Sequence, residues 1–155
     1  MKFLENIQQA LTIIKTSDYL LYMTYPLIKD KKLLLKIVSE IKKAITLCIG
    51  SILQYEYLHK RITLYQNPEV NFRTFREKCA PLYQITSQEL SLILELFDII
   101  KEHERSSVEF LREDKVVILS DNMRQKTLSV EKTKEFLQLS KNILAKTKER
   151  FIRKI

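Results

Sequence analysis

A single glycine in 155 residues, Gly50, is the feature that most constrains this chain. Only three prolines accompany it. β-Sandwiches and barrels need many residues of both kinds for their turns, and phosphate-cradling loops need clustered glycines. Few long helices joined by short connections are therefore the predicted architecture. P-loop and Rossmann sites are excluded because Gly50 stands alone.

Apolar residues recur every three to four positions through most of the chain, as in helices with one buried face. The pattern predicts helices over residues 2–24, 31–65, 87–105 and 130–153, within a bundle of three long helices and one or two short ones. The second would be a rod about 50 Å long at 1.5 Å per residue. Gly50 lies inside it, where glycine costs roughly 1 kcal/mol against alanine, so we expect close approach of a neighbouring helix or a bend there.

Short polar signals mark the expected helix ends. Pro26 should end the first helix, because the residue before a proline is pushed out of the helical region. A short helix is expected from Phe72 to about Cys79. The expected N-caps are residues whose side chains can accept a hydrogen bond from the first turn: Asp30, Asn71, Thr86 (in a capping box with Glu89) and Ser129.

Residues 106–128 show a different pattern from the helices around them. Val116 to Leu119 is apolar and mostly β-branched, which is typical of a strand. Asp121-Asn122 predicts a two-residue turn, and Met123 to Leu128 would form the returning strand of the hairpin. A hairpin alone is marginal in water, so helices must support it. The predicted fold class is mainly α: a single domain, residues 1–155, formed by an antiparallel helical bundle with a small β-hairpin or ribbon before the C-terminal helix.

Charge is distributed unevenly around a net value of +8. Residues 1–66 carry ten basic and five acidic groups, residues 67–113 six and nine, and residues 114–155 eleven and five. The basic segments either neutralise the acidic one within the fold or leave an excess on one face. An excess of that kind would attract a polyanion.

The chain shows no sign of a membrane or secretory destination. No apolar stretch reaches the roughly 18 residues that a spanning helix needs, and the first ten residues are too polar for a signal-peptide core. We expect a cytoplasmic protein without a membrane partner. Cys48 and Cys79 lack CxxC spacing and are expected to be buried, reduced thiols, not a disulfide or zinc site.

Residues for catalysis or metal binding are few. His59 and His103 lie among charged residues and are expected on the surface. Glu56 and His59 form one Glu-x-x-His step, but a di-iron bundle needs a second, and Ile100 stands three residues before His103. No GxSxG elbow is present. We therefore expect no catalytic residue, no metal site and no cofactor.

Two long helices joined by a turn and followed by a further helix resemble the HEPN group of four-helix bundles, many of which are ribonucleases with an Arg-x4–6-His motif. Residues 52–54 before His59 are Ile, Leu and Gln, and residues 96–98 before His103 are Leu, Phe and Asp. The resemblance therefore implies a helical bundle, while the catalytic motif is absent.

Two blocks of sequence are similar to a group of short archaeal proteins. Residues Thr16–Leu27 resemble the start of those proteins and Val108–Asp121 their later half. Together the blocks cover about a sixth of the chain. This resemblance implies no activity.

Lysine-rich helix faces are the remaining candidate sites. The expected nucleic-acid-binding residues are Lys32, Lys36 and Lys43 on the second helix, Lys115, Arg124 and Lys126 on the ribbon, and Lys134, Lys141 and Lys148, seven residues apart, on the last helix. Such stripes suit phosphate contact, and lysine favours non-specific contact over base reading. The predicted function is non-catalytic binding of RNA or a ribonucleoprotein. The alternatives are a protein–protein or homodimerisation module and a HEPN-like ribonuclease with a degenerate site.

Three tyrosines, Tyr19, Tyr22 and Tyr25, cluster near the end of the first helix. They could border a ligand groove or a subunit interface. We expect them instead to close the end of the bundle, with their rings packed and their hydroxyls in water.

Overall fold

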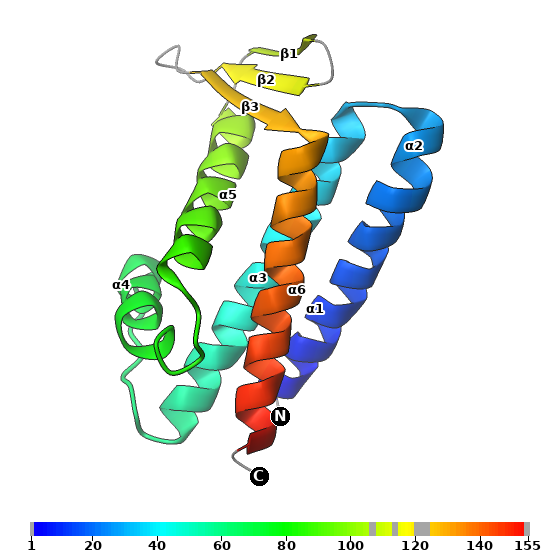
Figure 1. Cartoon of the computed structure of the whole chain (residues 1–155). Helices are drawn as coiled ribbons and strands as arrows, with labels where there is room; N and C mark the ends of the chain where they lie inside the picture. Colours follow the sequence, from blue (N-terminus) through cyan, green and yellow to red (C-terminus); the bar gives the residue numbers. More distant parts are fainter. Residues whose placement is uncertain (1, 106–107, 113–114, 120–124, 154–155) are drawn as a thin grey trace.

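A bundle of long helices forms the body of the protein in the computed structural model, which describes residues 2–105, 108–112, 115–119 and 125–153. The long helices are α1 (Lys2–Tyr19), α3 (Lys32–Leu58), α5 (Ser87–Arg105) and α6 (Val130–Arg153). α1 and α5 run in one direction along the bundle, and α3 and α6 run in the other (Figure 1). The predicted mainly α fold class is confirmed.

The helix α3 lies at the centre of the core, in contact with α1, α5 and α6. Ile37, Ile41 and Ile45 are fully buried along it. Burial of one such side chain stabilises a fold by about 1.5–3 kcal/mol. A polar contact also joins α3 to the start of α1, because Ser51 Oγ donates a hydrogen bond to the carbonyl of Phe3 at 2.9 Å. The central part of the 31–65 seam is therefore the main core surface, as its periodicity predicts.

Gly50 has a different environment from the one its position suggested. A Cβ built on this residue meets no neighbouring atom within 4 Å. The expectation that it permits close approach of another helix is wrong, because no helix comes that near. The structure gives no packing reason for a glycine here.

The first helix does not end at Pro26. A π-helical turn, η1 (Leu20–Thr24), leads directly into the short helix α2 (Tyr25–Ile28), and Pro26 lies in its first turn. The Tyr25 amide donates to the carbonyl of Leu20, five residues back. This wider turn makes room for the proline ring, which would otherwise clash with the preceding turn. The chain finally turns at Lys29, which adopts a left-handed conformation (φ 54°).

The helix α3 ends at Leu58, seven residues before the predicted end at Tyr65. Lys60 adopts a left-handed conformation (φ 60°). Its amide donates to the carbonyl of Tyr57 at 2.9 Å, and the Arg61 amide donates to that of Glu56 at 3.0 Å. These two bonds form a Schellman motif, which usually places glycine where Lys60 lies. Sequence patterns missed this stop because a left-handed lysine gives no local signal.

The segment after α3 forms α4 (Pro68–Thr74) and a second π-helical turn, η2 (Phe75–Cys79). Asn67 is the N-cap, and its side chain accepts from the amides of Glu69 and Val70. The predicted cap, Asn71, lies inside the helix, and its side-chain amide pairs with both backbone groups of Tyr65 at 2.7 and 2.8 Å. A helix here was expected, but its cap and start were wrong by several residues, because either asparagine can serve as a cap.

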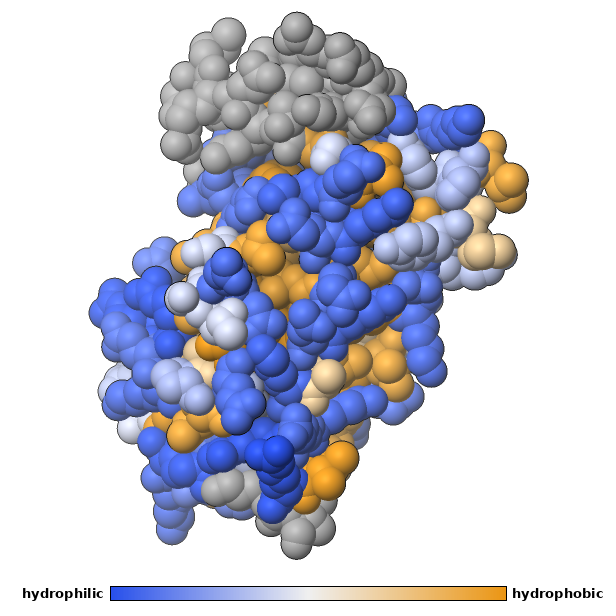
Figure 2. Space-filling model, viewed as in Figure 1, coloured by the Kyte–Doolittle hydropathy of each residue, from blue (hydrophilic) through white to orange (hydrophobic). Residues whose placement is uncertain are grey.

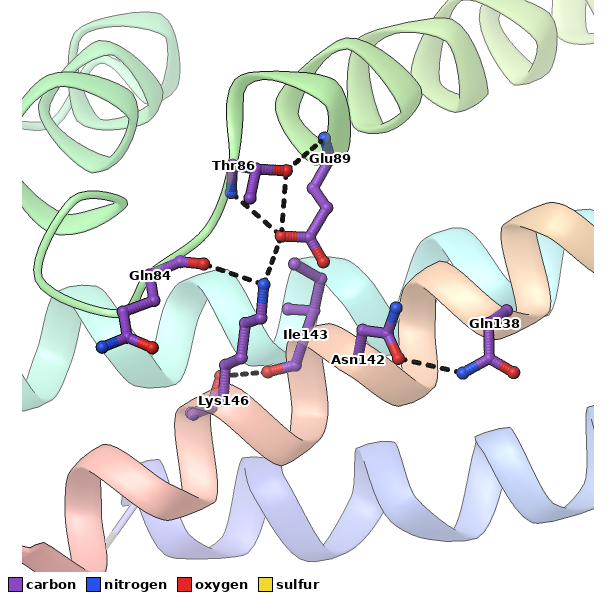
Figure 3. Close-up of polar contacts among 8 residues, drawn as sticks. Gln84, Thr86, Glu89, Gln138, Asn142, Ile143 and Lys146 are labelled. Atoms are coloured by element: carbon purple, nitrogen blue, oxygen red, sulfur yellow. Dashed lines mark hydrogen bonds and ion pairs between the residues drawn. The ribbon is translucent and has the colours of Figure 1, made fainter.

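The capping box at the start of α5 is confirmed (Figure 3). The Thr86 amide donates to Glu89 Oε1 at 2.9 Å, and the Glu89 amide donates to Thr86 Oγ1 at 3.1 Å. Lys146 of α6 adds an ion pair to Glu89 at 2.5 Å and donates to the Gln84 carbonyl at 2.8 Å. This cap therefore also joins α5 to α6.

The ribbon is an antiparallel three-stranded sheet in the order β1 (Val108–Arg112), β2 (Lys115–Leu119), β3 (Gln125–Ser129). It lies across one end of the bundle (Figure 1). Ile118 and Leu128 are fully buried, so the sheet packs against the helices, which supply the support that a small hairpin needs to be stable. The register pairs Leu119 with Gln125, which makes the β2–β3 connection longer than the predicted two-residue turn. That turn, Asp121-Asn122, lies outside the described residues.

The tyrosine cluster packs only in part. Tyr25 is buried, and its hydroxyl accepts from Lys31 Nζ at 2.5 Å. Tyr19 and Tyr22 are 61% and 47% exposed, so the expectation that all three rings pack is wrong for these two. The helix turns their side chains away from the face that buries Leu21 and Tyr25. Among the described helices, none is long and apolar enough to span a membrane.

Candidate nucleic-acid interface

The last helix, α6, carries the most regular of the predicted lysine stripes. Ser129 caps this helix as predicted, with its hydroxyl accepting from the Lys132 amide at 3.1 Å. Lys134, Lys141 and Lys148 follow at intervals of seven residues, about 10.5 Å apart along the axis. Seven residues are close to two helical turns, so the three lysines lie on one side of α6.

All three lysines of this stripe are oriented toward the first helix of the bundle. Lys134 Nζ lies 5.5 Å from the centre of the Tyr22 ring, within range of a cation–π contact. Lys141 Nζ forms an ion pair with Asp18 at 2.6 Å. Lys148 lines a groove beside Lys15 of α1. The stripe therefore follows the α1–α6 boundary.

The groove between α1 and α6, which we call the α1–α6 groove, has a volume of about 410 Å³. Its floor is apolar and its rim is charged. The floor consists of Leu11, Ile14, Leu144 and Ala145, and the rim of Lys15, Asp18, Lys141 and Lys148. Hydrophobic surface is visible between the two helices in Figure 2. Asp18 is compensated by Lys141, and within the described part of the chain Lys15 and Lys148 form no ion pair. The rim therefore has net positive charge.

The lysines of α3 lie elsewhere. Lys32, Lys36 and Lys43 are exposed, and Lys43 pairs with Glu40 at 3.1 Å. Lys43 borders a different depression, of about 460 Å³, whose α1 wall is Gln9 and Ile13. At 3.6 residues per turn, those two residues are about half a turn away from Leu11 and Lys15 on α1. The structure therefore places Lys43 of α3 on the opposite side of α1 from Lys141 and Lys148 of α6.

The predicted ribbon cations contribute no described side chain to either surface. Lys115 lies in β2 opposite Ser129, and Lys126 lies in β3 opposite Ile118. The side chains of these two lysines, and all of Arg124, are outside the described residues. The α1–α6 groove thus brings two of the predicted residues, Lys141 and Lys148, into one cavity.

Lys15 and Tyr22 were absent from the predicted site. Lys15 is an isolated cation in α1 and gives no stripe of its own. A weak signal exists in the spacing of Leu11, Lys15 and Asp18, which places them on one face beside the buried stripe of α1. That face becomes part of a groove only when α6 packs next to it.

Glu56 is fully buried near the end of α3 and ionically paired. Arg61 Nε donates to its carboxylate, the Tyr83 hydroxyl donates to it at 2.8 Å, and Arg150 Nε lies 3.8 Å away. Burial raises the pKa of Glu56, but the Arg61 and Tyr83 hydrogen bonds and the two arginine charges lower it below its usual value overall. This cluster joins α3 to the turn after η2 and to α6.

His59 takes no part in the Glu56 cluster. Its side chain is exposed, as predicted, and its ring lies 4.4 Å from that of Tyr55. The Glu-x-x-His step is thus divided between a buried carboxylate and a surface imidazole. Within the described ranges, no group of three or more His, Cys, Asp or Glu side chains is placed to hold a metal ion. Cys48 and Cys79 are buried, free thiols, as predicted.

Comparison of the chain with protein families, curated proteins and solved structures finds no match. The HEPN-like and archaeal resemblances therefore stay predictions. A functional assignment has to rest on the residues of the α1–α6 groove and their geometry.

Proposed function

We propose that this protein binds RNA, alone or within a ribonucleoprotein, through the α1–α6 groove and without cleaving it. The observation that supports the proposal is the row of lysines on α6, in which Lys141 and Lys148 line the α1–α6 groove opposite Lys15 and Lys134 continues the row beside Tyr22. Cations in a row can follow a phosphate backbone, and each phosphate contact releases a counterion.

The composition of the groove favours non-specific contact with a single strand. Its cations are lysines, which bind phosphate as point charges and lack the planar fork with which arginine contacts base edges. Tyr22, 47% exposed beside Lys134, offers a ring on which a base can stack. We place this activity in the cytoplasm, where Cys48 and Cys79 would stay reduced.

Fluorescence anisotropy with a labelled, mixed-sequence single-stranded RNA tests the proposal. If four lysines contact phosphates, affinity falls about fifty-fold between about 50 and 200 mM salt, from a slope of roughly −0.7 per contact. Replacing Lys15, Lys141 and Lys148 together by glutamine should reduce the slope by about two units. The matched control replaces Lys32, Lys36 and Lys43 by glutamine, which removes the same charge from exposed positions of α3 outside the α1–α6 groove.

Each outcome has a defined meaning. Equal weakening by both triple variants would show that net charge matters and the groove does not. Absence of binding at about 50 mM salt would refute the RNA proposal. A dimer that survives high salt would then favour the protein–protein alternative. RNA cleavage by highly purified protein, abolished by His59→Ala or His103→Ala, would favour the degenerate nuclease.

A further inference from the structure

The corner where the first helical rod turns toward α3 exposes an unusual amount of apolar surface. We call it the corner patch, and its residues are Tyr19 (61% exposed), Tyr22 (47%), Met23 (58%), Leu27 (86%) and Ile28 (61%). Hydrophobic atoms protrude there, at the upper right of Figure 2, over α2. A patch of several large apolar side chains on one corner marks an interaction surface.

The segment that carries the corner patch is apolar on both of its faces. Residues 19–28 contain no charged residue. Leu21 and Tyr25 face the core, and Tyr19, Met23 and Leu27, spaced four residues apart, occupy another face of the same rod. A helix that is apolar all round is normally covered on all sides. Within the described residues, nothing of this chain covers the outer face.

Lysines surround the corner patch. Lys29, Lys31 and Lys32 follow it directly in the chain, and Lys134 lies over the Tyr22 ring. Asp30, the acidic residue between Lys29 and Lys31, accepts a hydrogen bond from the Lys32 amide at 3.0 Å. The border of the patch therefore has net positive charge.

This border determines which partner fits. A second copy of the chain placed symmetrically on the patch would bring two sets of lysines together, which is repulsive. An anionic lipid surface instead offers negative headgroups to the lysines and an apolar interior to Leu27 and Ile28. Tyrosines are enriched at that boundary, because the ring is apolar and the hydroxyl stays in water.

We propose that the corner patch inserts into the headgroup region of an anionic lipid bilayer. Ten uncharged residues are too few to cross a membrane, so the contact is peripheral, about 5–10 Å deep. The expectation of no membrane partner came from the lack of a spanning segment, and a surface contact needs none. The corner patch shares Tyr22 and its neighbour Lys134 with the proposed RNA site, but the inserting residues Leu27 and Ile28 lie outside the α1–α6 groove, so this inference does not depend on RNA binding.

Co-sedimentation with lipid vesicles tests the insertion. Wild-type protein should bind vesicles of phosphatidylcholine mixed with phosphatidylglycerol, and should bind pure phosphatidylcholine much more weakly. Leu27→Ser with Ile28→Ser should reduce partitioning at least about tenfold, since two inserted side chains are lost. The matched control is Leu4→Ser with Ile152→Ser, which removes the same residue types, 51% and 68% exposed, from the other end of the bundle (Figure 1).

Three results would overturn the proposal. The first is absence of binding to the anionic vesicles. The second is equal weakening by the corner and control variants. The third is a wild-type dimer, seen by light scattering without lipid, that the corner variant converts to a monomer, because the patch would then be a self-association surface. RNA affinity of the corner variant should stay at the wild-type level.

Discussion

Replacing Arg61 by alanine should reveal how much the Glu56 cluster stabilises the fold. Glu56 would lose one charge-assisted hydrogen bond, a contact typically worth about 1.5–3 kcal/mol. Loss of one partner from a fully buried pair costs about 3–5 kcal/mol. Arg61 is 30% exposed, and Tyr83 and Arg150 remain beside the carboxylate, so the cost should be smaller. We expect Arg61→Ala to lower the free energy of unfolding at pH 7 by about 2 kcal/mol.

The pH dependence of that loss tests its cause. In the wild type the pKa of Glu56 is below its usual value. Its ionised form therefore stabilises the fold above the ordinary pKa of glutamate, about 4.3, and this contribution disappears as the pH falls through the folded-state pKa. Without Arg61 the pKa of Glu56 should rise, because burial is less compensated. The difference between wild type and variant should then shrink as the pH is lowered from 7 to about 4.

Urea denaturation followed by far-ultraviolet circular dichroism at several pH values measures these differences. The control is Arg153→Ala, which removes an exposed pair with Glu149 (68% and 58% exposed) and should cost less than about 0.5 kcal/mol. The reasoning fails if Arg61→Ala costs no more than this control. It also fails if the cost is the same at pH 7 and at about pH 4.

Four further predictions follow from the described geometry. Gly50→Ala should raise the free energy of unfolding by about 1 kcal/mol, and the melting temperature by about 2–4 °C, because the added methyl enters open space on a helix; a lower melting temperature would contradict the open geometry. Lys60→Gly should raise the free energy of unfolding, measured by urea denaturation, by about 1 kcal/mol, because glycine adopts the left-handed conformation without strain. An unchanged free energy of unfolding would show that Lys60 is not a source of strain in this turn. Thr86→Ala should destabilise by about 1 kcal/mol through loss of the capping box, also read by urea denaturation. Cys48 and Cys79 should react with a thiol reagent at pH 8 only after unfolding, because burial raises their pKa values to about 12 and about 11; fast labelling of the native protein would contradict their burial.

Sequence patterns predicted the fold best where a strong local signal exists. The Thr86–Glu89 capping box and the Ser129 cap lie where the side-chain chemistry placed them. The central seam of α3 is buried as its periodicity requires. These features depend on neighbours within about one helical turn, which a sequence shows directly.

The ends of several helices could not be predicted in this way. Lys29, Lys60 and Gln84 adopt left-handed conformations at helix ends, at positions where glycine is normally the signal. A single-glycine chain has to use other residues there, and the surrounding contacts select which ones. At Lys60 the next residue, Arg61, is held by Glu56 through both its amide and its side chain. At Pro26 the error was the opposite one: a helix end was predicted, but the helical rod continues because a π-helical turn accommodates the proline.

Only the α6 wall of the candidate site was predicted from the sequence. The spacing of Lys134, Lys141 and Lys148 showed a cationic stripe on the last helix. The facing wall, with Lys15, depends on which helix packs against α6, and no local pattern gives that information. The burial of Glu56 was missed for the same reason, since its partners Tyr83 and Arg150 come from distant segments.

The order of synthesis gives the α1–α6 groove a further property. Its walls are joined by the ion pair between Asp18 and Lys141, which are 123 residues apart, and α6 follows every other described element in the chain. A nascent chain that has formed α1 and α3 carries one wall and leaves core surface uncovered until α6 arrives. The groove and the completed core therefore form in the same folding step, the packing of α6. On the proposed function, RNA would be held only after α6 has been synthesised and has packed against α1.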